Sequence, residues 1–415
     1  MKTGEIIAVG ITAQSTSIVC LDSKGKPVRP AILYMDSRAE DIGAEISRGR
    51  ALGYTPLKYF SNLEWMKRFE SRKLERTKMV LDAKEFIAYK LTGVHTHDSR
   101  ALPRNILEEL SSELGFPLEW FGGEHGYFSP VGEVTSWAEE ETGIAEGTPV
   151  VVGPWDGFCN IIGSGLIKPG IAMDVAGTTE IISVALKEKV PAAYIPHLID
   201  GLWLAYKSPP LGIAHKWFLI RLMSSEKKFA EESGLDPYDL LSALAQKAPA
   251  GCNGLICVPT LKGEFGKKHL RGGFIGVSIA HGKEYLARAL LEGIAFHVRM
   301  VFEELEALGA EIEKVRLSGG GAKSKFWSQI RADVTGKTFE VVEAIETGCL
   351  GAAMLALIAT GKYRDLVSAT EEMVRISRVY KPDPERHKKY SDLYKKYRRA
   401  YEFLDKLYEA HVISD

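Results

Sequence analysis

The feature that most constrains the fold is the alternation of short β-branched runs with longer segments of helical periodicity. Runs such as PVVVG (149–153), IAMDVA (171–176) and KVRLSGG (314–320) are too short for helices and rich in Val and Ile, so they predict buried strands. Apolar spacing predicts helices over residues 39–50, 56–92, 215–247, 283–308, 324–335 and 347–360. Strands that alternate with helices in this way indicate an α/β protein.

The opening residues predict part of a sheet. The segments EIIAVGIT (5–12), SIVCLD (17–22) and VRPAILYMDSR (28–38) have the composition of strands, and SKGKP (23–27) has that of a turn. The helical segment 56–92 is interrupted near Ser71 and Thr77, which predicts at least two helices there.

The size of the chain predicts two domains, because 415 residues exceed the length at which a single hydrophobic core stops growing. Hydrophobic residues at 45% and charged residues at 26% are typical of globular proteins and argue against disorder. A net charge of −1 gives no overall attraction to nucleic acid or to anionic membranes. Motif positions place the domain boundary near 163–169, giving domains of 1–165 and 166–415.

The cysteines and the N-terminal segment predict a cytoplasmic protein. Five cysteines scattered over a chain of this length do not form a disulfide framework, which favours a reducing compartment. No segment approaches the roughly eighteen apolar residues of a membrane span. The apolar stretch at the start is short and is interrupted by Glu5, unlike a secretory signal.

Asp156 is the first candidate for chemistry. In VVVGPWDGF it follows a predicted strand, where the chain turns through Gly157, and ligands of α/β sheets bind at the carboxyl ends of strands. Its carboxylate could equally cap the following helix, because Asp is a preferred N-cap residue. The sequence does not distinguish a capping carboxylate from a catalytic base.

Two further loops have the composition of phosphate-binding sites. AGTT (176–179) combines a glycine with two Thr hydroxyls between two predicted strands, although an ordinary hairpin turn explains it as well. SGGGAKS (318–324) places three glycines between a strand and the N-terminus of a helix, which offers free N–H groups and a positive dipole end. Three consecutive glycines cost chain entropy, so a ligand or close packing is expected to require them.

Two other patterns favour structural roles. His95 and His97 in HTHD could suggest a metal, but with one Asp and no fourth ligand we predict surface loop residues. The C-terminal segment has a basic helix with an aromatic stripe, which could bind RNA but is more typical of a helix that packs on its own domain. The stripe consists of Tyr390, Tyr394, Tyr397, Tyr401, Leu404 and Tyr408.

Taken in order, these segments resemble the FGGY family of carbohydrate kinases, which share the actin, hexokinase and Hsp70 type of ATPase fold, a ribonuclease H-like α/β architecture. The resemblance extends over the whole chain and keeps the order of the family's motifs. The matching segments are GITAQSTSIVCLDSKGKPVRPAILYMDSR, YKLTGVHTHDSRA, ETGIAEGTPVVVGPWDG, GLICVPTLKGE with RGGFIGVSIAH, ARALLEGIAFHVR, SGGGAKSKFWSQIRADVTG and GCLGAAMLA.

The resemblance implies roles for matching residues. Asp156 would be the general base that takes the proton of the substrate hydroxyl, with ATP and Mg²⁺ as cofactors; no metal-binding residue is assigned. The implied phosphate contacts are Gly177, Thr178 and Thr179. The implied adenosine pocket consists of Gly319, Gly320, Gly321, Ala322 and Ser324. The implied sugar contacts are Gln14, Ser15, Thr16, Ser99 and Gly157.

The implied function is ATP-dependent phosphorylation of a hydroxyl of a small sugar or polyol, and a ketopentose such as xylulose is the first choice. Small neutral residues at the implied sugar contacts suit hydroxyls better than carboxylates. Residues 1–165 would form the sugar-binding domain, and residues 166–415 the nucleotide-binding domain with its C-terminal helix. The partner is a small sugar or polyol, with no nucleic acid and no membrane, and a homodimer is left open.

The start of the chain departs from the family. Members begin with a strand, an Asp, Gly-Thr and a hairpin that form a first phosphate loop, and no segment of this sequence matches it. The chain is therefore expected to begin downstream of that loop, which would leave Ile6, Ala8 and Ile11 beside an unpaired sheet edge. The alternative function is a catalytically silent or fragmentary relative that binds sugar or nucleotide. A chaperone or filament relative of the same fold ranks last.

Overall fold

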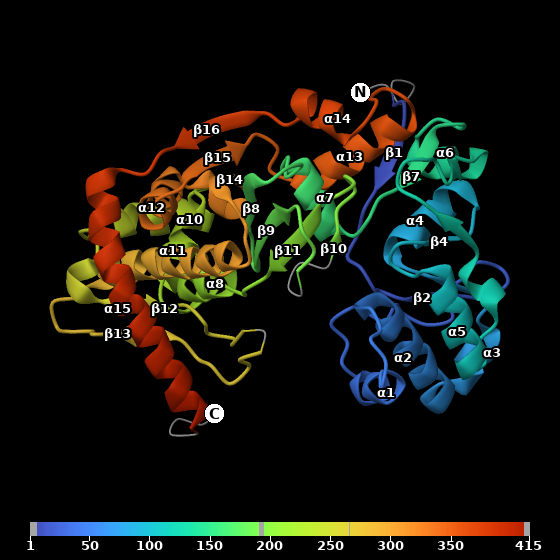
Figure 1. Cartoon of the computed structure of the whole chain (residues 1–415), viewed down its shortest axis with the longest axis horizontal. Coiled ribbons are helices and arrows are strands. Elements are labelled where there is room, and N and C mark those ends of the chain that lie inside the picture. The colour runs from blue at the N-terminus through green and yellow to red at the C-terminus, as the bar shows by residue number, and fades with distance from the viewer. Residues whose placement is uncertain (1–5, 191–194, 265, 411–415) are drawn as a thin grey trace. The chain divides into compact units, whose positions relative to one another are not determined.

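The computed structural model describes residues 6–190, 195–264 and 266–410 (Figure 1). The chain forms two compact units: unit 1 comprises Met1–Gly163 and Gly348–Met373, and unit 2 comprises Ser164–Thr347 and Val374–Asp415. Unit 1 thus takes in a segment from late in the chain, whereas the predicted domains 1–165 and 166–415 are continuous. Those domain boundaries remain a prediction.

Unit 1 combines short strands with helices. Its strands are β1 (Val9–Ile11), β2 (Val19–Leu21), β3 (Met79–Leu81), β4 (Thr96–Asp98), β5 (Gly123–His125), β6 (Gly132–Glu133) and β7 (Pro149–Val152). Its helices are α1 (Glu40–Ile46), α2 (Tyr54–Phe69), α3 (Ser71–Arg76), α4 (Ala83–Thr92), α5 (Arg104–Leu114), the 3-10 helix η2 (Leu118–Phe121), α6 (Ser136–Thr142), α7 (Asp156–Gly163), α14 (Leu366–Met373) and, from its second residue onward, α13 (Thr347–Ala359).

The strand that leads to Asp156 lies in the middle of a small sheet in unit 1. The order of this sheet is β1-β7-β6, with β1 parallel and β6 antiparallel to β7. Val150, Val151 and Val152 are fully buried, which is why PVVVG forms a strand with both faces covered. β1 lies at the edge of this sheet, and a Cβ on its Gly10 would stand 2.3 Å from the carbonyl oxygen of Ala352 in α13. Glycine at this position therefore allows α13 to pack against β1.

The region predicted as helices over 56–92 contains a strand. β3 separates α3 from α4 and pairs antiparallel with β2, with Val19 opposite Leu81. The error arises because three apolar residues in a row fit a helix face and a buried strand equally well. The predicted strand over 28–38 is reduced to isolated bridges such as Ile18 with Ile32. The SKGKP turn is confirmed, since the N–H of Asp22 donates to the carbonyl of Lys26 at 2.9 Å.

The prediction that HTHD is a surface loop is wrong. Thr96–Asp98 forms β4, which pairs in parallel with β5, and His97 and Asp98 are both buried. His97 is held by a 3.1 Å contact between its Nδ1 and the carbonyl oxygen of Phe121. Burial lowers the pKa of His97, which keeps the ring neutral.

Unit 2 is built on a seven-stranded sheet of order β10-β11-β9-β8-β14-β15-β16. Its strands, including a separate β12–β13 pair, are β8 (Gly170–Ala176), β9 (Glu180–Leu186), β10 (Ile195–Pro196), β11 (Trp203–Lys207), β12 (Ile256–Val258), β13 (Gly273–Ile275), β14 (Ile312–Ser318), β15 (Thr338–Val342) and β16 (Ile376–Tyr380). Its helices are α8 (Gly212–Arg221), α9 (Ser224–Glu232), α10 (Pro237–Gln246), α11 (Lys283–Ala307), α12 (Lys325–Thr335), α15 (Pro384–Glu409) and the 3-10 helices η3 (Cys252–Gly254) and η4 (Gly320–Lys323).

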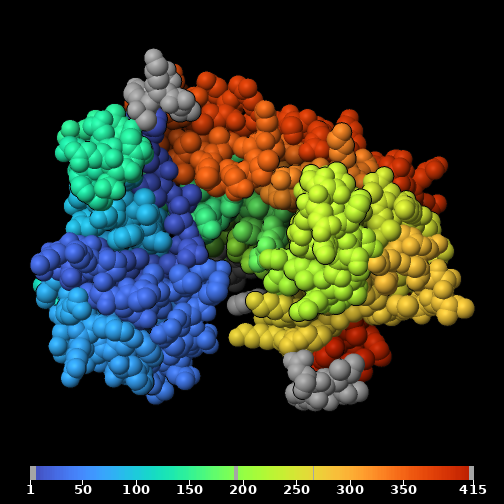
Figure 2. All heavy atoms as spheres, turned by 180° about the vertical axis from the view of Figure 1, so that it is seen from behind, coloured from blue at the N-terminus to red at the C-terminus, as the bar shows by residue number. Residues whose placement is uncertain are grey.

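The helices of unit 2 cover this sheet. The long helix α11 contacts α10, α12 and β12, and most of its apolar side chains are buried. In the space-filling view, the yellow-green segment with α9 and α10 forms one surface of unit 2 (Figure 2). Strands β8, β14 and β15 run in parallel at the centre of the sheet, so the loops that follow them leave from the same edge.

The C-terminal aromatic stripe packs on its own unit, as predicted. Tyr390, Tyr394, Tyr397 and Tyr401 of α15 are buried, and the ring of Phe296 in α11 lies 5.4 Å from that of Tyr397. Buried hydroxyls find partners, since Tyr390 donates to Glu292 at 2.8 Å. In the parts of the chain that the structure describes, no helix has the length and apolar character needed to cross a membrane.

Candidate active site

Asp156 stands where β7 ends and α7 begins. Gly153 to Trp155 connect the buried strand to the helix, and the Asp156 side chain is exposed. One carboxylate oxygen accepts a 2.7 Å hydrogen bond from the N–H of Gly157, at the N-terminus of α7. The capping contact and an accessible carboxylate therefore occur together, so the local structure allows both roles considered for Asp156.

The segment 12–17 lies directly beside Asp156. The N–H of Asp156 donates to the carbonyl of Ala13 at 3.0 Å, and the hydroxyl of Thr12 donates to the carbonyl of Pro154 at 2.8 Å. Gln14 is the residue after Ala13, and its side-chain amide donates to the hydroxyl of Ser17 at 2.9 Å. The structure thus brings the predicted base and the first predicted sugar contacts together.

Thr16 occupies a strained position in this segment. It has φ 61°, in the left-handed region that Thr rarely adopts, and it is fully buried. Its N–H donates to Asp82 at 2.8 Å, and that of Ser17 donates to the same carboxylate at 3.0 Å. Thr16 therefore sets the shape of the segment, while Gln14 and Ser15 remain half-buried.

The other two predicted sugar contacts also belong to unit 1. Ser99 follows β4, is half-buried, and its hydroxyl donates to the carbonyl of His125 at 3.0 Å. Gly157 is buried, and a Cβ there would stand 2.8 Å from the indole nitrogen of Trp155. Glycine at position 157 leaves room for Trp155 beside the base.

A pocket that was not predicted from the sequence lies near the segment 12–17. It has a volume of about 490 Å³ and is lined by residues of α1, α2 and the preceding loop, among them Tyr34, Tyr54 and Lys58. Burial raises the pKa of Tyr54, and a hydrogen bond with the Thr16 hydroxyl opposes this shift. A larger pocket of about 860 Å³ in unit 2 includes none of the predicted site residues in its lining. We therefore assign the site from side-chain chemistry and not from pocket size.

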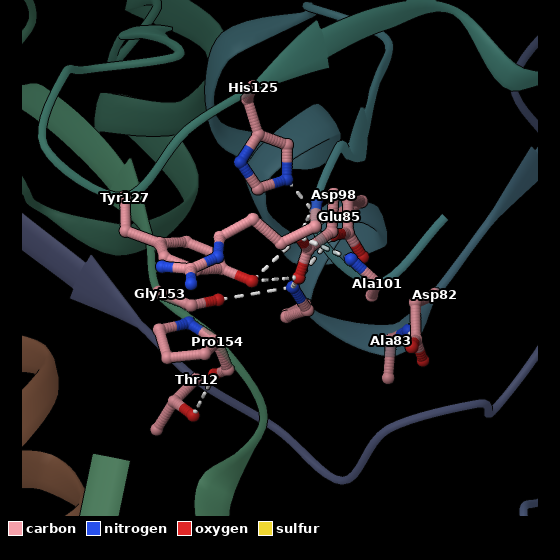
Figure 3. Close-up of polar contacts among 12 residues, drawn as sticks. Thr12, Asp82, Ala83, Glu85, Asp98, Ala101, His125, Tyr127, Gly153 and Pro154 are labelled. Carbon is pink, nitrogen blue, oxygen red and sulfur yellow. Dashed lines mark hydrogen bonds and ion pairs between the residues drawn. The ribbon is translucent and has the colours of Figure 1, made fainter. Parts of the chain in front are cut away.

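A buried charge cluster at the first turn of α4 was also missed. Lys84 is 2% exposed, and its ammonium contacts Asp98 at 2.6 Å, Glu85 at 3.0 Å and the carbonyl of Gly153 at 3.1 Å. Glu85 in turn contacts His125 Nε2 at 3.0 Å. In the close-up, Glu85, Asp98 and His125 converge from separate segments near Gly153 (Figure 3). Helical spacing could have revealed Lys84, because it stands four and seven residues before the buried Ala88 and Leu91.

The charges in this cluster are mutually compensated. Burial opposes ionisation of Asp98, but the Lys84 ammonium and the Tyr127 hydroxyl outweigh it and lower the pKa of Asp98 to about 2. Burial likewise opposes the charge of Lys84, yet the neighbouring carboxylates hold its pKa well above the ordinary value. Asp82, at the N-cap of α4, differs, since burial and the nearby Glu85 carboxylate raise its pKa to about 7.

The two predicted nucleotide loops of unit 2 contact each other. AGTT forms the turn of the β8–β9 hairpin, with Gly177 and Thr178 exposed. Gly319 has φ 80°, and a Cβ there would stand 2.9 Å from the carbonyl oxygen of Ala176. A Cβ on Gly321 would stand 2.7 Å from the Cβ of Ala176, so both glycines are required by local packing.

The remaining residues of the second loop have different environments. Around Gly320, no atom lies within 4 Å of the place where a Cβ would stand. Ala322 is buried, and Ser324 caps α12 by accepting from the N–H of Trp327 at 3.2 Å. Ser324 also bonds to the hydroxyl of Ser242 at 2.9 Å. Gly320 is therefore the glycine of this loop that local packing does not explain.

A second buried cation, Arg331 of α12, lies beneath these loops. Its Nη1 contacts Asp174 of β8 at 2.8 Å and Glu180 of β9 at 2.5 Å, and all three side chains are fully buried. Its guanidinium carbon lies 4.3 Å from the ring centroid of Trp327. Asp174 and Glu180 stand on the two strands that flank AGTT, so Arg331 links the hairpin to the helix after SGGGAKS.

The two loops carry donor groups of the kind that bind phosphate. Among the described residues, no group of three or more His, Cys, Asp or Glu side chains could hold a metal ion. The Thr178 hydroxyl of AGTT is on an exposed residue and can donate to phosphate oxygens, whereas the N–H of Gly177 donates to the carbonyl of Val175 at 3.0 Å. Gly320 allows a ligand to approach its backbone closely. ATP binding at these loops and the participation of Mg²⁺ remain predictions.

Comparisons with known proteins identify one family of enzymes. Residues 1–112 match the model described as FGGY family of carbohydrate kinases, N-terminal domain, and residues 172–360 match that family's C-terminal domain. The gluconokinase of Bacillus subtilis (strain 168) is 27% identical over 93% of this chain and 80% of its own length. The L-xylulose/3-keto-L-gulonate kinase of Escherichia coli (strain K12) is 26% identical over 95% and 82%.

Solved structures show the same likeness. The xylulose kinase from Rhodospirillum rubrum superposes with a TM-score of 0.80 at 26% identity, covering 97% of this chain and 85% of that chain. The predicted α/β sugar kinase fold is thereby confirmed.

Proposed function

The chain belongs to the FGGY family of carbohydrate kinases, and from this premise we propose that it transfers the γ-phosphoryl group of ATP to a hydroxyl of a small sugar or polyol. The observation that carries the proposal is the exposed carboxylate of Asp156 beside the segment that contains Gln14 and Ser15. The backbone N–H of Asp156 donates to the carbonyl of Ala13, the residue before Gln14. A base beside polar groups that can bind a sugar is the arrangement that this reaction needs.

In the proposed step, Asp156 accepts the proton of the attacking hydroxyl. The hydroxyl oxygen forms a bond to the γ-phosphorus, the bond from that phosphorus to the oxygen bridging to the β-phosphate breaks, and ADP leaves with that electron pair. ATP supplies the transferred phosphoryl group. Phosphoryl transfer depends mainly on positioning and charge stabilisation, so one well-placed carboxylate suffices as the base. Gln14, Ser15 and Ser99 would orient the sugar.

In unit 2, we assign the phosphate contacts to Gly177, Thr178 and Thr179. The adenosine contacts would come from 319–324, where Ala322 and Ser324 shape the loop and Gly320 presents open backbone. The N-terminus of α12 adds a positive dipole end close to this loop. Unit 2 would therefore hold the nucleotide, and unit 1 the sugar and its base.

The first substrate class to test is the ketopentoses, with xylulose as the leading choice. Two kinds of relative carry xylulose or L-xylulose in their names. Gluconate is the main alternative substrate to test, because a gluconokinase is a relative of similar identity. Neutral side chains at Gln14, Ser15 and Ser99 can bind sugar hydroxyls through hydrogen bonds. A gluconate site would be expected to place a cation against the substrate carboxylate.

The substitution Asp156→Asn tests the base. Asn caps helices about as well as Asp, so unfolding should change little, while kcat falls by about 100- to 10,000-fold. Asp236→Asn is the matched control, because Asp236 caps α10 and accepts the N–H of Tyr238 at 2.8 Å. Kinase turnover of the Asp156 variant at the level of the control would leave capping as the only role of Asp156.

The substitution Gly320→Ala tests the nucleotide loop. Because no atom lies within 4 Å of the added Cβ, stability should change by less than about 0.5 kcal/mol. The KM for ATP should rise about tenfold, which corresponds to ~1.4 kcal/mol, because the methyl group stands where the nucleotide approaches. Gly273→Ala in β13 is the control, since that position is equally open. An unchanged KM for ATP would remove Gly320 from the nucleotide site.

A further inference from the structure

We propose that Lys84 is a positioning residue that fixes the segment carrying Asp156 to the segment carrying Ser99. The inference rests on the proposed function, because it concerns how the base and the sugar contacts keep their places. Lys84 contacts neither group directly. It acts through the carbonyl of Gly153, three residues before Asp156, and through Asp98, the residue before Ser99.

The ammonium of Lys84 contacts oxygens on three different residues: it donates hydrogen bonds to Asp98 and to the carbonyl of Gly153, and it forms an ion pair with Glu85. The oxygens are Asp98 Oδ2 at 2.6 Å, Glu85 Oε1 at 3.0 Å and the carbonyl oxygen of Gly153 at 3.1 Å. An ion pair of Lys84 requires only a carboxylate as its partner and no contact with the main chain. The contact with a main-chain carbonyl adds a link to the backbone at the end of β7, where the chain turns toward Asp156.

Asp98 transmits the position of Lys84 to the turn that follows β4. One of its oxygens accepts the N–H groups of Arg100 at 3.0 Å and Ala101 at 3.1 Å. The Tyr127 hydroxyl donates to the same carboxylate at 2.7 Å (Figure 3). Ser99 lies inside this turn, so its backbone is fixed on both sides by groups that converge on Asp98.

The first turn of α4 also holds the remaining sugar segment. Asp82 accepts the N–H groups of Thr16 and Ser17, and Glu85 contacts His125, whose carbonyl accepts the Ser99 hydroxyl. Residues 82–85 thus bind the three segments that contain all the predicted sugar contacts and the base. A buried pair that served stability alone would not need contacts with each of these segments.

The test combines hydrogen exchange with kinetics on the full chain. In Lys84→Met, amide exchange in residues 98–101 and 153–158 should become at least about tenfold faster, because their shared anchor is lost. Exchange in 312–318 of unit 2 should not change. With the best sugar of a kinase panel, kcat should fall about 100-fold, as expected when a base is displaced by about 1 Å.

Two variants keep the test decisive. If Lys84→Met does not fold, Asp98→Asn keeps the shape of the anchor while weakening it, and the same two segments should exchange faster. Arg331→Met removes the buried cation of unit 2 and should leave residues 98–101 and 153–158 unchanged. If the wild type phosphorylates no sugar, the proposed function fails, whereas the exchange pattern still decides whether Lys84 fixes these segments.

Two results would overturn the proposal. One is wild-type exchange in both segments together with wild-type kcat. The other is an acceleration in these two segments that is no larger than in the rest of unit 1, which would identify Lys84 as a contributor to general stability only.

Discussion

Lys84 in unit 1 and Arg331 in unit 2 are both buried cations beneath predicted ligand loops, yet their surroundings differ. Lys84 contacts oxygens on three different residues, and Asp98 and Glu85 receive further donors from Tyr127 and His125, so that of these two carboxylates only Oε2 of Glu85 lacks a partner among the described residues. In unit 2, both carboxylates converge on Nη1 of Arg331. Within the described residues, Nε and Nη2 of Arg331 and one oxygen of each carboxylate have no hydrogen-bond partner.

The direction of the pKa shift also differs between Asp98 in unit 1 and Asp174 in unit 2. In unit 1, the donors around Asp98 lower its pKa to about 2. In unit 2, burial and the facing carboxyl of Glu180 raise the pKa of Asp174 well above its ordinary value, despite Arg331. Two carboxyl groups that share one nitrogen favour retention of a proton between them. A buried cation therefore keeps a paired carboxylate ionised where further donors such as Tyr127 and His125 also reach it, even though Oε2 of Glu85 lacks a hydrogen-bond partner among the described residues.

The largest contrast is expected on removing each cation. Lys84→Met leaves two ionised carboxylates buried and should lower the free energy of unfolding by about 5 kcal/mol. Arg331→Met should cost less, about 3 kcal/mol, because Asp174 and Glu180 can share a proton. Urea unfolding followed by circular dichroism measures both values. Equal losses would show that the two clusters are electrostatically alike.

Matched Asp→Asn substitutions test the same contrast at single carboxyl groups. Asp98→Asn removes a charge that Lys84 requires and should destabilise the protein by about 3 kcal/mol at pH 7. Asp174→Asn resembles the protonated carboxyl already favoured there and should change stability by less than about 1 kcal/mol. Thermal unfolding of the two variants and the wild type ranks them. A larger loss at Asp174 than at Asp98 would contradict the account.

A smaller effect is expected in the pH dependence of unfolding. The pKa of Asp98 is about 2 in the folded protein and 3.8 ordinarily, so its stabilisation is complete above 3.8 and is lost as the pH falls toward 2. That loss is on the order of 2 kcal/mol. Asp98→Asn should remove this part of the loss of stability in acid. The measurement is the change in the free energy of unfolding between pH 5 and pH 2, compared between the variant and the wild type.

The pH dependence of unfolding that is expected from Asp82 has the opposite sign, so Asp82 serves as an internal control. Its pKa is about 7 in the folded protein, so between pH 4 and 7 the folded state holds a proton that the unfolded state has released. The contribution of Asp82 therefore decreases as the pH rises through this range. Asp82→Asn should remove that decrease, and a variant with an unchanged slope would show that Asp82 is ionised at neutral pH.

The parts of the molecule that the sequence predicted are those with long or ordered patterns. The α11 helix, the hairpin around AGTT and the packing of the C-terminal tyrosines followed from periodicity. The strand before Asp156 followed from its Val run. The short strands β3 and β4 did not, because the three residues of each fit several structures equally well.

The charge clusters escaped prediction for a different physical reason. A Lys next to a Glu in a helix is usually exposed, and only the partners contributed by β4, β5 and the end of β7 make burial of Lys84 possible. Arg331 had the same difficulty, because Asp174 and Glu180 lie more than a hundred residues away in sequence. Such partners become visible only when the segments are brought together.

The most direct test of the account is sugar-dependent release of ADP by the wild-type chain. Purified protein with ATP and Mg²⁺ is offered D-xylulose, L-xylulose, gluconate, erythritol and glycerol, and ADP is measured with a coupled assay. We predict turnover that depends on a sugar or polyol, highest with a ketopentose, and lost in Asp156→Asn. No ADP release above the background without sugar, while thermal shift still detects sugar or nucleotide binding, would contradict the kinase assignment and favour a binding protein.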